Sequence, residues 1–80
     1  MRLRVNTASG SMYILDSEEM TWERVNDEKP IRFYEGHDKG HLALWPTVTA
    51  GWGMQFTDVN PSEEFSVPIW TTQVVRIELI

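Results

Sequence analysis

The feature that most constrains this chain is a two-residue alternation of apolar and polar side chains near both of its ends. The pattern runs through residues 72–80 and again through residues 1–7. A period of two is typical of a β-strand with one buried face. The apolar positions are Met1, Leu3, Val5, Val75, Ile77 and Leu79. We therefore expect an all-β domain with both ends of the chain inside its sheet, and no tail left for tethering or targeting.

Turn residues divide the first third of the chain into a three-stranded meander. The predicted strands cover residues 2–7, 11–15 and 20–25. Gly10 closes the first turn, because glycine adopts the positive φ that tight hairpins require. The polar run 16–19 provides the second reversal.

The remaining sequence predicts further short strands between polar loops. The glycines on both sides of Trp52 indicate a bend or bulge, and Pro68 indicates an edge or irregular strand because proline lacks an N–H. The expected strands are 31–35, 42–45, 47–56, 65–70 and 72–80, and the expected loops are 26–30, 36–41 and 58–64, the last with one helical turn after Pro61. No stretch keeps a 3.6-residue period, so no long helix is expected. This spacing favours a small SH3-like barrel or a strongly twisted antiparallel meander, as a single domain over residues 1–80.

Composition limits both the core and the function. The chain has no cysteine, which excludes disulfides and thiolate metal sites, and its four tryptophans, three phenylalanines and two tyrosines predict an aromatic core. Seven basic residues against twelve acidic ones give a net charge of −5, which argues against a nucleic-acid partner. The sequence has no apolar run of membrane-spanning length and no apolar signal region, so we expect an intracellular protein without a membrane partner.

Three motifs, which cover roughly the first third and the last tenth of the chain, carry a resemblance to a known group. They are Val5-x-Thr7-x-Ser9-Gly10-Ser11-x-Tyr13-x-Leu15-Asp16, Thr21-Trp22-x-Arg24 and Thr71-Thr72-x-Val74-Val75-Arg76-Ile77-Glu78. In these motifs the chain resembles small accessory proteins encoded by actinobacteriophages, whose functions are mostly unassigned. The resemblance implies a phage protein that acts in the host cytoplasm. Its motifs are strand and turn residues, so it implies a shared fold and no site residues.

Residues suited to catalysis or metal binding are sparse. His37-Asp38-x-x-His41 has metal-ligand character, but Gly36 and Gly40 oppose a helix there and no fourth ligand is nearby. The serines lie in turns or at strand ends, and none is in a G-x-S-x-G elbow. The adjacent carboxylates Glu18-Glu19 and Glu63-Glu64 would face opposite sides of a strand or open water. We therefore expect a solvated loop at His37–His41, no metal or other cofactor, and no enzymatic activity.

Three tryptophans are candidates for a partner-binding surface, namely Trp45, Trp52 and Trp70. Trp45 precedes a proline, Trp52 lies between two glycines, and Trp70 ends a proline-containing stretch, so each is near a loop or bend. Trp22 lies within an alternating strand and is expected in the core. We expect two of the four tryptophans to be buried outright and one, Trp52, to be a partly exposed anchor.

The charges and apolar residues of the terminal strands raise two further expectations. If these strands pair, Arg2, Arg4 and Arg76 project from one outer face beside Glu78, where they could contact an acidic partner or discourage edge-to-edge aggregation. We favour protection of the edge, because exposed charge pairs contribute little binding energy. The apolar Ile80 predicts burial in the fold or in a subunit contact, which leaves a monomer and a homodimer both open.

The function that these features predict is non-enzymatic binding of a host or phage protein. The anchor would be Trp52 or Trp45, framed by the loops 36–41 and 58–64. One alternative is an acidic decoy that occupies the nucleic-acid-binding site of a host enzyme, which the charge of −5 permits. The other is a small structural or assembly component of the virion.

Overall fold

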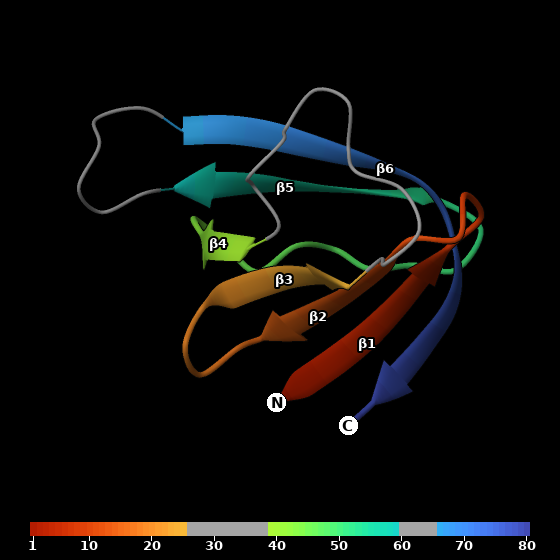
Figure 1. Ribbon diagram of the computed structural model, residues 1–80, viewed down its shortest axis with the longest axis horizontal. Coiled ribbons are helices and arrows are strands. Elements are labelled where there is room, and N and C mark those ends of the chain that lie inside the picture. The colour runs from red at the N-terminus through yellow and green to blue at the C-terminus, as the bar shows by residue number, and fades with distance from the viewer. Residues whose placement is uncertain (26–38, 60–65) are drawn as a thin grey trace.

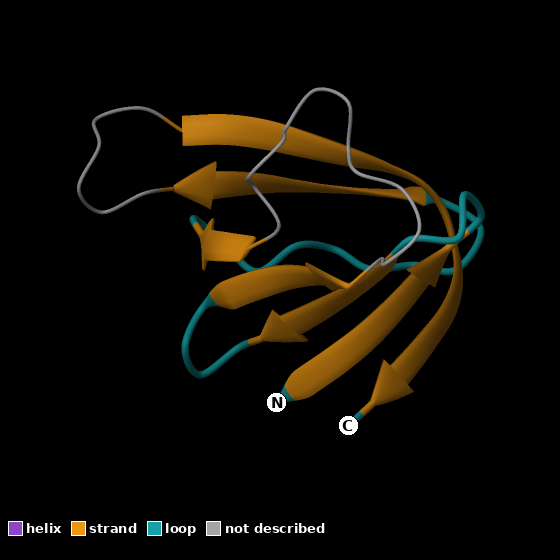
Figure 2. Ribbon diagram, viewed as in Figure 1, coloured by secondary structure: helices purple, strands orange, loops and turns teal. Residues whose placement is uncertain are grey.

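Six β-strands make up the regular structure of the described residues (Figure 1). The computed structural model describes residues 1–25, 39–59 and 66–80. The strands are β1 (Arg2–Thr7), β2 (Met12–Asp16), β3 (Thr21–Val25), β4 (Lys39–Leu42), β5 (Gly53–Val59) and β6 (Ser66–Leu79). Strands and loops account for all of the described chain, which contains no helix (Figure 2). The predicted loop 26–30, strand 31–35 and helical turn after Pro61 lie outside the described residues.

The strands form a closed antiparallel barrel in the order β1-β2-β3-β4-β5-β6. β1 pairs with β2 on one side and with β6 on the other, so the two ends of the chain lie side by side (Figure 1). The all-β class is confirmed, and the closed barrel is consistent with the small SH3-like kind. None of the described segments forms a helix long and apolar enough to cross a membrane.

The predicted three-stranded meander is also confirmed. β2 pairs with β1 and with β3 along its full length. Gly10 in the first turn has a φ of 91°, the left-handed conformation for which a glycine was expected. In the second turn the Asp16 carboxylate accepts hydrogen bonds from the backbone N–H groups of Glu18, at 2.9 Å, and Glu19, at 3.1 Å. The first reversal thus uses a glycine, and the Asp16 carboxylate stabilises the second.

β6 is one long strand that serves both halves of the barrel. Its first part, from Ser66 to Gln73, pairs with β5, and its second part, from Val74 to Leu79, pairs with β1. The expected strands 65–70 and 72–80 therefore merge into one element. Pro68 pairs with β5, and no described strand pairs with its other side, so the edge position expected for this proline is confirmed.

β4 departs from the sequence prediction. Most of it lies within residues 36–41, for which the sequence predicts a loop, and the predicted strand 42–45 contributes only its first residue. The reason is Gly40, which lies opposite Trp22 in the β3–β4 ladder. A methyl group on Gly40 would overlap the Asp58 carboxylate and would lie 2.9 Å from Nε1 of Trp22. The glycine that suggested a loop is therefore required for the close approach of a strand.

β5 lies further along the chain than the predicted strand 47–56. It begins at Gly53, so the residues before it form a loop, and it continues into the first two residues of the predicted loop 58–64. The bend predicted near Trp52 is confirmed, because Gly51 has a φ of 92°. The alternation of buried and exposed residues therefore begins in β5, after the turn at Gly51.

Asp58 is accommodated in β5 because its carboxylate is satisfied within the barrel. Its Oδ1 accepts a hydrogen bond from Nε1 of Trp22 at 2.9 Å and another from the backbone N–H of His41 at 3.1 Å. One carboxylate oxygen therefore joins β3, β4 and β5.

The core is aromatic, as the composition predicts. The ring of Phe56 makes an edge-to-face contact with Tyr13, at a centroid distance of 5.9 Å, and a tilted contact with Trp22, at 5.1 Å. The buried cluster consists of Val5, Tyr13, Leu15, Trp22, Leu42, Met54, Phe56, Ile69 and Val74. Trp45 and Val48, from the loop between β4 and β5, are partly buried and pack against it. This loop therefore covers the core where the short β4 ends.

Candidate functional site

The four tryptophans occupy three kinds of environment. Trp22 is 1% exposed, Trp45 is half-buried against the core, and Trp52 and Trp70 are 73% and 70% exposed. The expectation that two tryptophans would be buried is wrong, because other side chains already fill the small interior of the barrel. The predicted exposure of Trp52 is confirmed.

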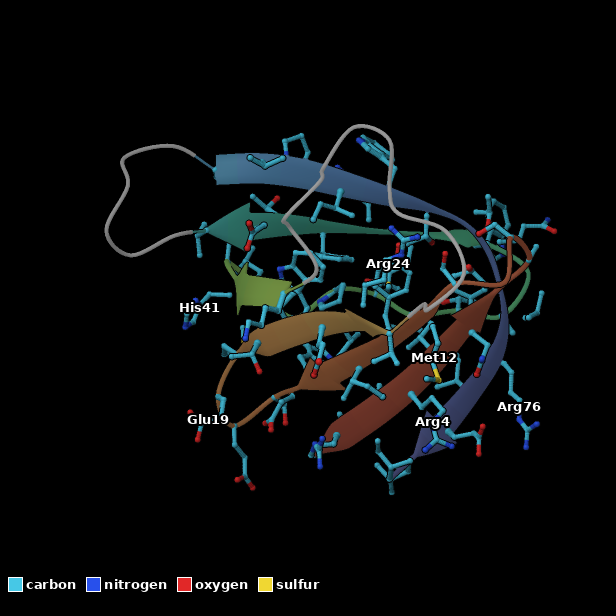
Figure 3. The ribbon with its side chains drawn as sticks, in the orientation of Figure 1. Arg4, Met12, Glu19, Arg24, His41 and Arg76 are labelled. Carbon is cyan, nitrogen blue, oxygen red and sulfur yellow. The ribbon has the colours of Figure 1, made fainter. Side chains whose placement is uncertain are left out.

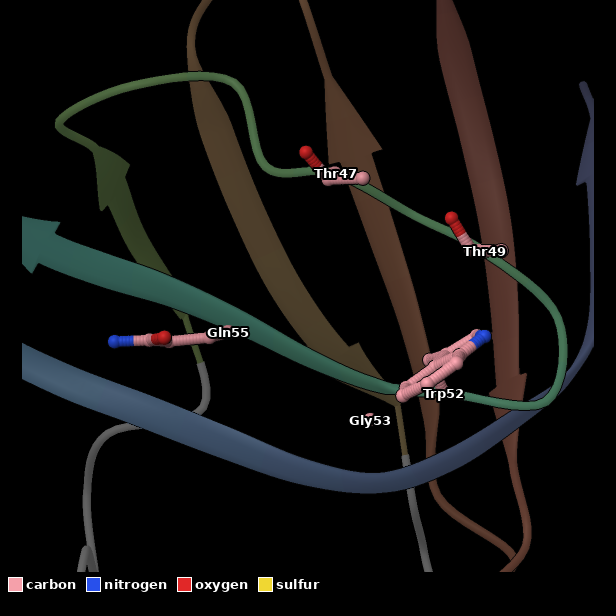
Figure 4. A pocket seen from close by; sticks show the side chains of 5 residues that line it. All are labelled: Thr47, Thr49, Trp52, Gly53 and Gln55. Atoms are coloured by element: carbon pink, nitrogen blue, oxygen red, sulfur yellow. The ribbon is translucent and has the colours of Figure 1, made fainter.

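Trp52 lies at one end of a surface hollow of about 440 Å³, which we call the tryptophan groove. The groove is lined by Thr47, Thr49, Trp52, Gly53 and Gln55. Figure 4 shows the segment with Thr47 and Thr49 along one side and β5 along the other, with Trp52 where this segment turns into β5. The hollow therefore lies on the surface between β5 and the segment that precedes it, and it is open to solvent.

The backbone around Trp52 is held in place from both sides. Its N–H donates to the carbonyl of Thr49 at 3.2 Å, and its own carbonyl accepts from the N–H of Val74 at 2.9 Å. The N–H of Gly51 donates to the carbonyl of Val74 at 2.8 Å. The indole is thus an exposed aromatic side chain on a fixed backbone, which reduces the entropy that a partner must overcome on binding.

The edge of β5 is unpaired along the groove. Pro68 has no N–H, so Thr57 and Pro68 face each other as a pair that exchanges no hydrogen bonds. Gln55 and Trp70 lie two residues further along the same ladder and are therefore a pair of the same kind. The N–H and C=O of Gln55 hence point away from β6 and toward the groove, and no described backbone group pairs with them. At the other end of this edge, the carbonyl of Thr57 accepts from the N–H of Ala43 at 3.1 Å.

Trp70 extends this surface across the sheet. It is the cross-strand partner of Gln55, so the two side chains leave the same face. Trp70 also lines a second hollow, of about 210 Å³, together with residues of β2, β3, β6 and the first turn. Those residues are Ser9, Ser11, Tyr13, Arg24, Ile69, Thr71 and Thr72. Trp70 and the second hollow therefore lie across the β5–β6 ladder from Gln55, which lines the tryptophan groove.

The second hollow was not predicted from the sequence. It contains Tyr13, whose pKa is raised by burial, an effect that the charge of Arg24 partly opposes. The phenol therefore stays neutral near pH 7. The signal that could have revealed the hollow is the β2–β3 register, which places Tyr13 opposite Arg24.

Trp45 and the predicted frame of the anchor differ from expectation. Trp45 packs against the core and lines neither hollow. Trp52 directly precedes the first residue of β5, whereas Asp58 lies near the other end of that strand, where β5 pairs with His41 and Leu42 of β4. The frame of Trp52 by residues 36–41 and 58–64 is therefore wrong for the described part of those segments. The length of β5 separates Trp52 from His41 and Asp58.

The predicted pairing of the terminal strands places the arginines as expected, but each has an acidic neighbour. Arg76 Nε lies 3.1 Å from Glu78 Oε1, Arg4 lies 3.7 Å from the other oxygen of Glu78, and Arg2 lies 3.9 Å from Asp16. Figure 3 shows Arg4 and Arg76 at the same end of the barrel. The acidic neighbours therefore neutralise much of the positive charge of this patch.

The histidine cluster is only partly described, because His37 and Asp38 lie outside the described residues. The His41 side chain points away from the barrel from an exposed position in β4 (Figure 3). Within residues 1–25, 39–59 and 66–80, no three His, Asp or Glu side chains gather closely enough to hold a metal ion.

Comparison of the chain with protein-family models, curated proteins and solved structures gives no match.

Proposed function

We propose that this chain is a non-enzymatic binding module that holds a protein partner through Trp52 and Trp70. The observation that carries this proposal is the exposure of both indoles, at 73% and 70%, on a small barrel whose core is already filled by other aromatic rings. A tryptophan can bury about 150–250 Å², so contact with a partner would remove a large apolar area from water. Tryptophan is also the residue type most enriched among binding hot spots.

The tryptophan groove adds polar groups to this aromatic surface. The hydroxyls of Thr47 and Thr49 and the free backbone groups of Gln55 belong to the same groove as the indole of Trp52. Such groups orient a partner while the aromatic rings supply most of the binding energy. This combination supports specific protein contact.

The resemblance to small actinobacteriophage proteins supports a host or phage protein as the partner and the host cytoplasm as the site of action. The net charge of −5 supports protein over nucleic acid. The largely neutralised arginines at the β1–β6 end favour the same choice, because they do not form a stripe of free positive charge.

The test is affinity capture from an actinobacterial lysate, followed by titration of the captured protein. The capture compares the wild type with Trp52→Ala, with washes at low salt and at about 0.5 M salt, where electrostatic attraction is screened. We expect a partner retained at high salt, whose Kd rises about 30-fold or more in Trp52→Ala, because hot-spot truncations cost about 2 kcal/mol or more.

Leu44→Ala is the matched control, because Leu44 is 79% exposed and lines neither hollow. It should bind as the wild type does. A Trp52→Ala protein that unfolds at the wild-type temperature and binds with unchanged Kd would show that the anchor is assigned wrongly. Retention only at low salt would instead support the acidic decoy.

A further inference from the structure

The second part of β6 carries an exposed apolar stripe that is separate from the tryptophans. Val75, Ile77 and Leu79 are 58%, 38% and 73% exposed, and they alternate with Arg76 and Glu78. The stripe is uncovered because the β5–β6 ladder ends at Gln73, after which β6 bends away along β1 (Figure 1). Ile80, for which the sequence predicts burial in the fold or in a subunit contact, is 46% exposed, so the first of these alternatives is wrong.

The backbone of this stripe is also free along one edge. Ile80 N–H donates to the carbonyl of Arg2 at 2.9 Å, which fixes the alternation of the β1–β6 ladder. Glu78 and Arg76 therefore exchange hydrogen bonds with β1, whereas the N–H and C=O groups of Ile77 and Leu79 point to the opposite side. No strand among the described residues pairs with that side. An apolar edge with unpaired backbone groups is a template for another strand.

We propose that the strand seated on this edge is β6 of a second copy of the chain, antiparallel to the first about a two-fold axis at Ile77. In this register Ile77 faces its own copy, Val75 faces Leu79, and Arg76 faces Glu78. The two Ile77 residues then form a hydrogen-bonded pair, because their free N–H and C=O groups point toward each other. The paired β6 strands join two barrels through a continuous sheet, and this arrangement does not depend on the tryptophan surface.

Charge complementarity selects both this partner and this register. Arg76 and Glu78 are adjacent positions on the outer face, so an axis at Ile77 brings opposite charges together on both sides. An axis at Arg76 or Glu78 would instead place like charges opposite each other, and it would turn the bonded backbone groups toward the axis. When two copies meet about the axis at Ile77, the β6 edge of one is complementary in charge to the same edge of the other. A two-fold interface requires this self-complementarity.

The first test is sedimentation equilibrium of the wild type and of Leu79→Lys. We expect the wild type to have the mass of two chains at about 100 µM, and Leu79→Lys to raise the dimer Kd at least about tenfold, since each dimer loses two apolar contacts. Leu79 is largely exposed in the single chain, so its replacement should leave the barrel folded. Leu44→Lys, a change at another exposed leucine, should leave the dimer intact. A wild-type mass of one chain would overturn the proposal.

The second test determines the register by disulfide cross-linking. The chain has no native cysteine, so an introduced cysteine is its only thiol. Directly opposed residues in a hydrogen-bonded pair have Cα atoms about 5.5 Å apart, within the range for a disulfide. Ile77→Cys should therefore form a disulfide-linked dimer on mild oxidation, whereas Thr49→Cys, at an exposed position in the tryptophan groove, should not. A wild-type dimer that Leu79→Lys does not weaken and Ile77→Cys does not cross-link would overturn the assignment to β6.

Discussion

At the scale of single residues, Asp58 shows how one carboxylate can fix the joint between three strands. Its Oδ1 accepts the N–H of the buried Trp22 indole and the backbone N–H of His41, and Gly40 leaves the space in which this happens. A buried donor without an acceptor is costly, because it has lost water without gaining a partner. The bonds therefore explain both a polar residue within β5 and a glycine within β4.

Replacement of Asp58 by alanine should lower the free energy of unfolding by about 1–3 kcal/mol, because two donors lose their acceptor. Asp58→Asn is the matched control, since it keeps an oxygen at the same position and should lose clearly less. Urea unfolding followed by tryptophan fluorescence measures both variants. Equal stability of Asp58→Ala and Asp58→Asn would show that the hydrogen bonds contribute little.

Asp16 makes stability depend on pH. The backbone N–H of Glu19, with further contributions from Glu18 and Arg2, holds its pKa below the ordinary value of 3.8, and desolvation opposes this only in part. A carboxyl whose pKa is lower in the folded state stabilises the fold above its unfolded pKa, and this stabilisation is lost as the pH falls through the folded value.

The difference in unfolding free energy between the wild type and Asp16→Asn should therefore be constant near neutral pH and shrink as the pH falls below about 4. Urea titrations of both proteins from about pH 7 to about pH 2 measure it. Asparagine can still accept the turn hydrogen bonds, so the comparison isolates the charge. A difference in unfolding free energy that stays constant from about pH 7 to about pH 2 would show that the Asp16 charge does not cause the pH dependence.

At the scale of elements, β4 is the weakest part of the barrel wall. Its ladder with β5 has two described pairs, His41–Val59 and Leu42–Asp58, whereas β2 is paired on both sides along its whole length. Few paired residues mean a low free energy of local opening. The seam between β4 and β5 should therefore open before the meander does.

Amide hydrogen exchange tests this order. The amides of His41 and Ala43, which donate to Asp58 and Thr57 of β5, should exchange at least about tenfold faster than that of Leu15 in β2, after correction for intrinsic rates. Equal protection would mean that the barrel opens only as a whole.

The accuracy of the sequence prediction also varied by element, for physical reasons. Alternation predicted β1, β2 and β3 because each has one buried face, and it also predicted the end of β6, although the apolar residues there are exposed. It failed at β4 and β5, where Gly40 and Asp58 look like loop residues and become strand residues only through a contact with Trp22. Such a contact between distant segments leaves no local pattern.

In the candidate site too, features set by neighbouring residues were predictable, and features set by contacts between distant segments were not. The glycines beside Trp52 were sufficient to predict its exposure, since a bend turns the side chain outward. Trp45 was misjudged, because its burial depends on how the loop after β4 lies across the core. The stripe on β6 has the pattern of a buried strand, and its exposure follows from the point at which β5 begins.

At the scale of the whole molecule, the barrel places two proposed contact surfaces on one small body. The tryptophan groove lies beside β5, and the apolar stripe lies on the second part of β6. A dimer joined through β6 would present two grooves, so a partner with two copies of its binding segment would be held more tightly than by one. Such a dimer would compensate for the small binding surface of a single short chain.

The double pairing of β6 has a consequence for how the molecule forms. β5 and β1 each depend on this one strand for a neighbour, and the β1–β6 ladder joins residues from opposite ends of the sequence. Contacts between distant residues are slow to form, because the intervening chain must first be ordered. During synthesis, the meander can assemble while the sides of β1 and β5 that β6 will occupy are still bare. Folding is then completed in a late step, when β6 arrives and joins both halves.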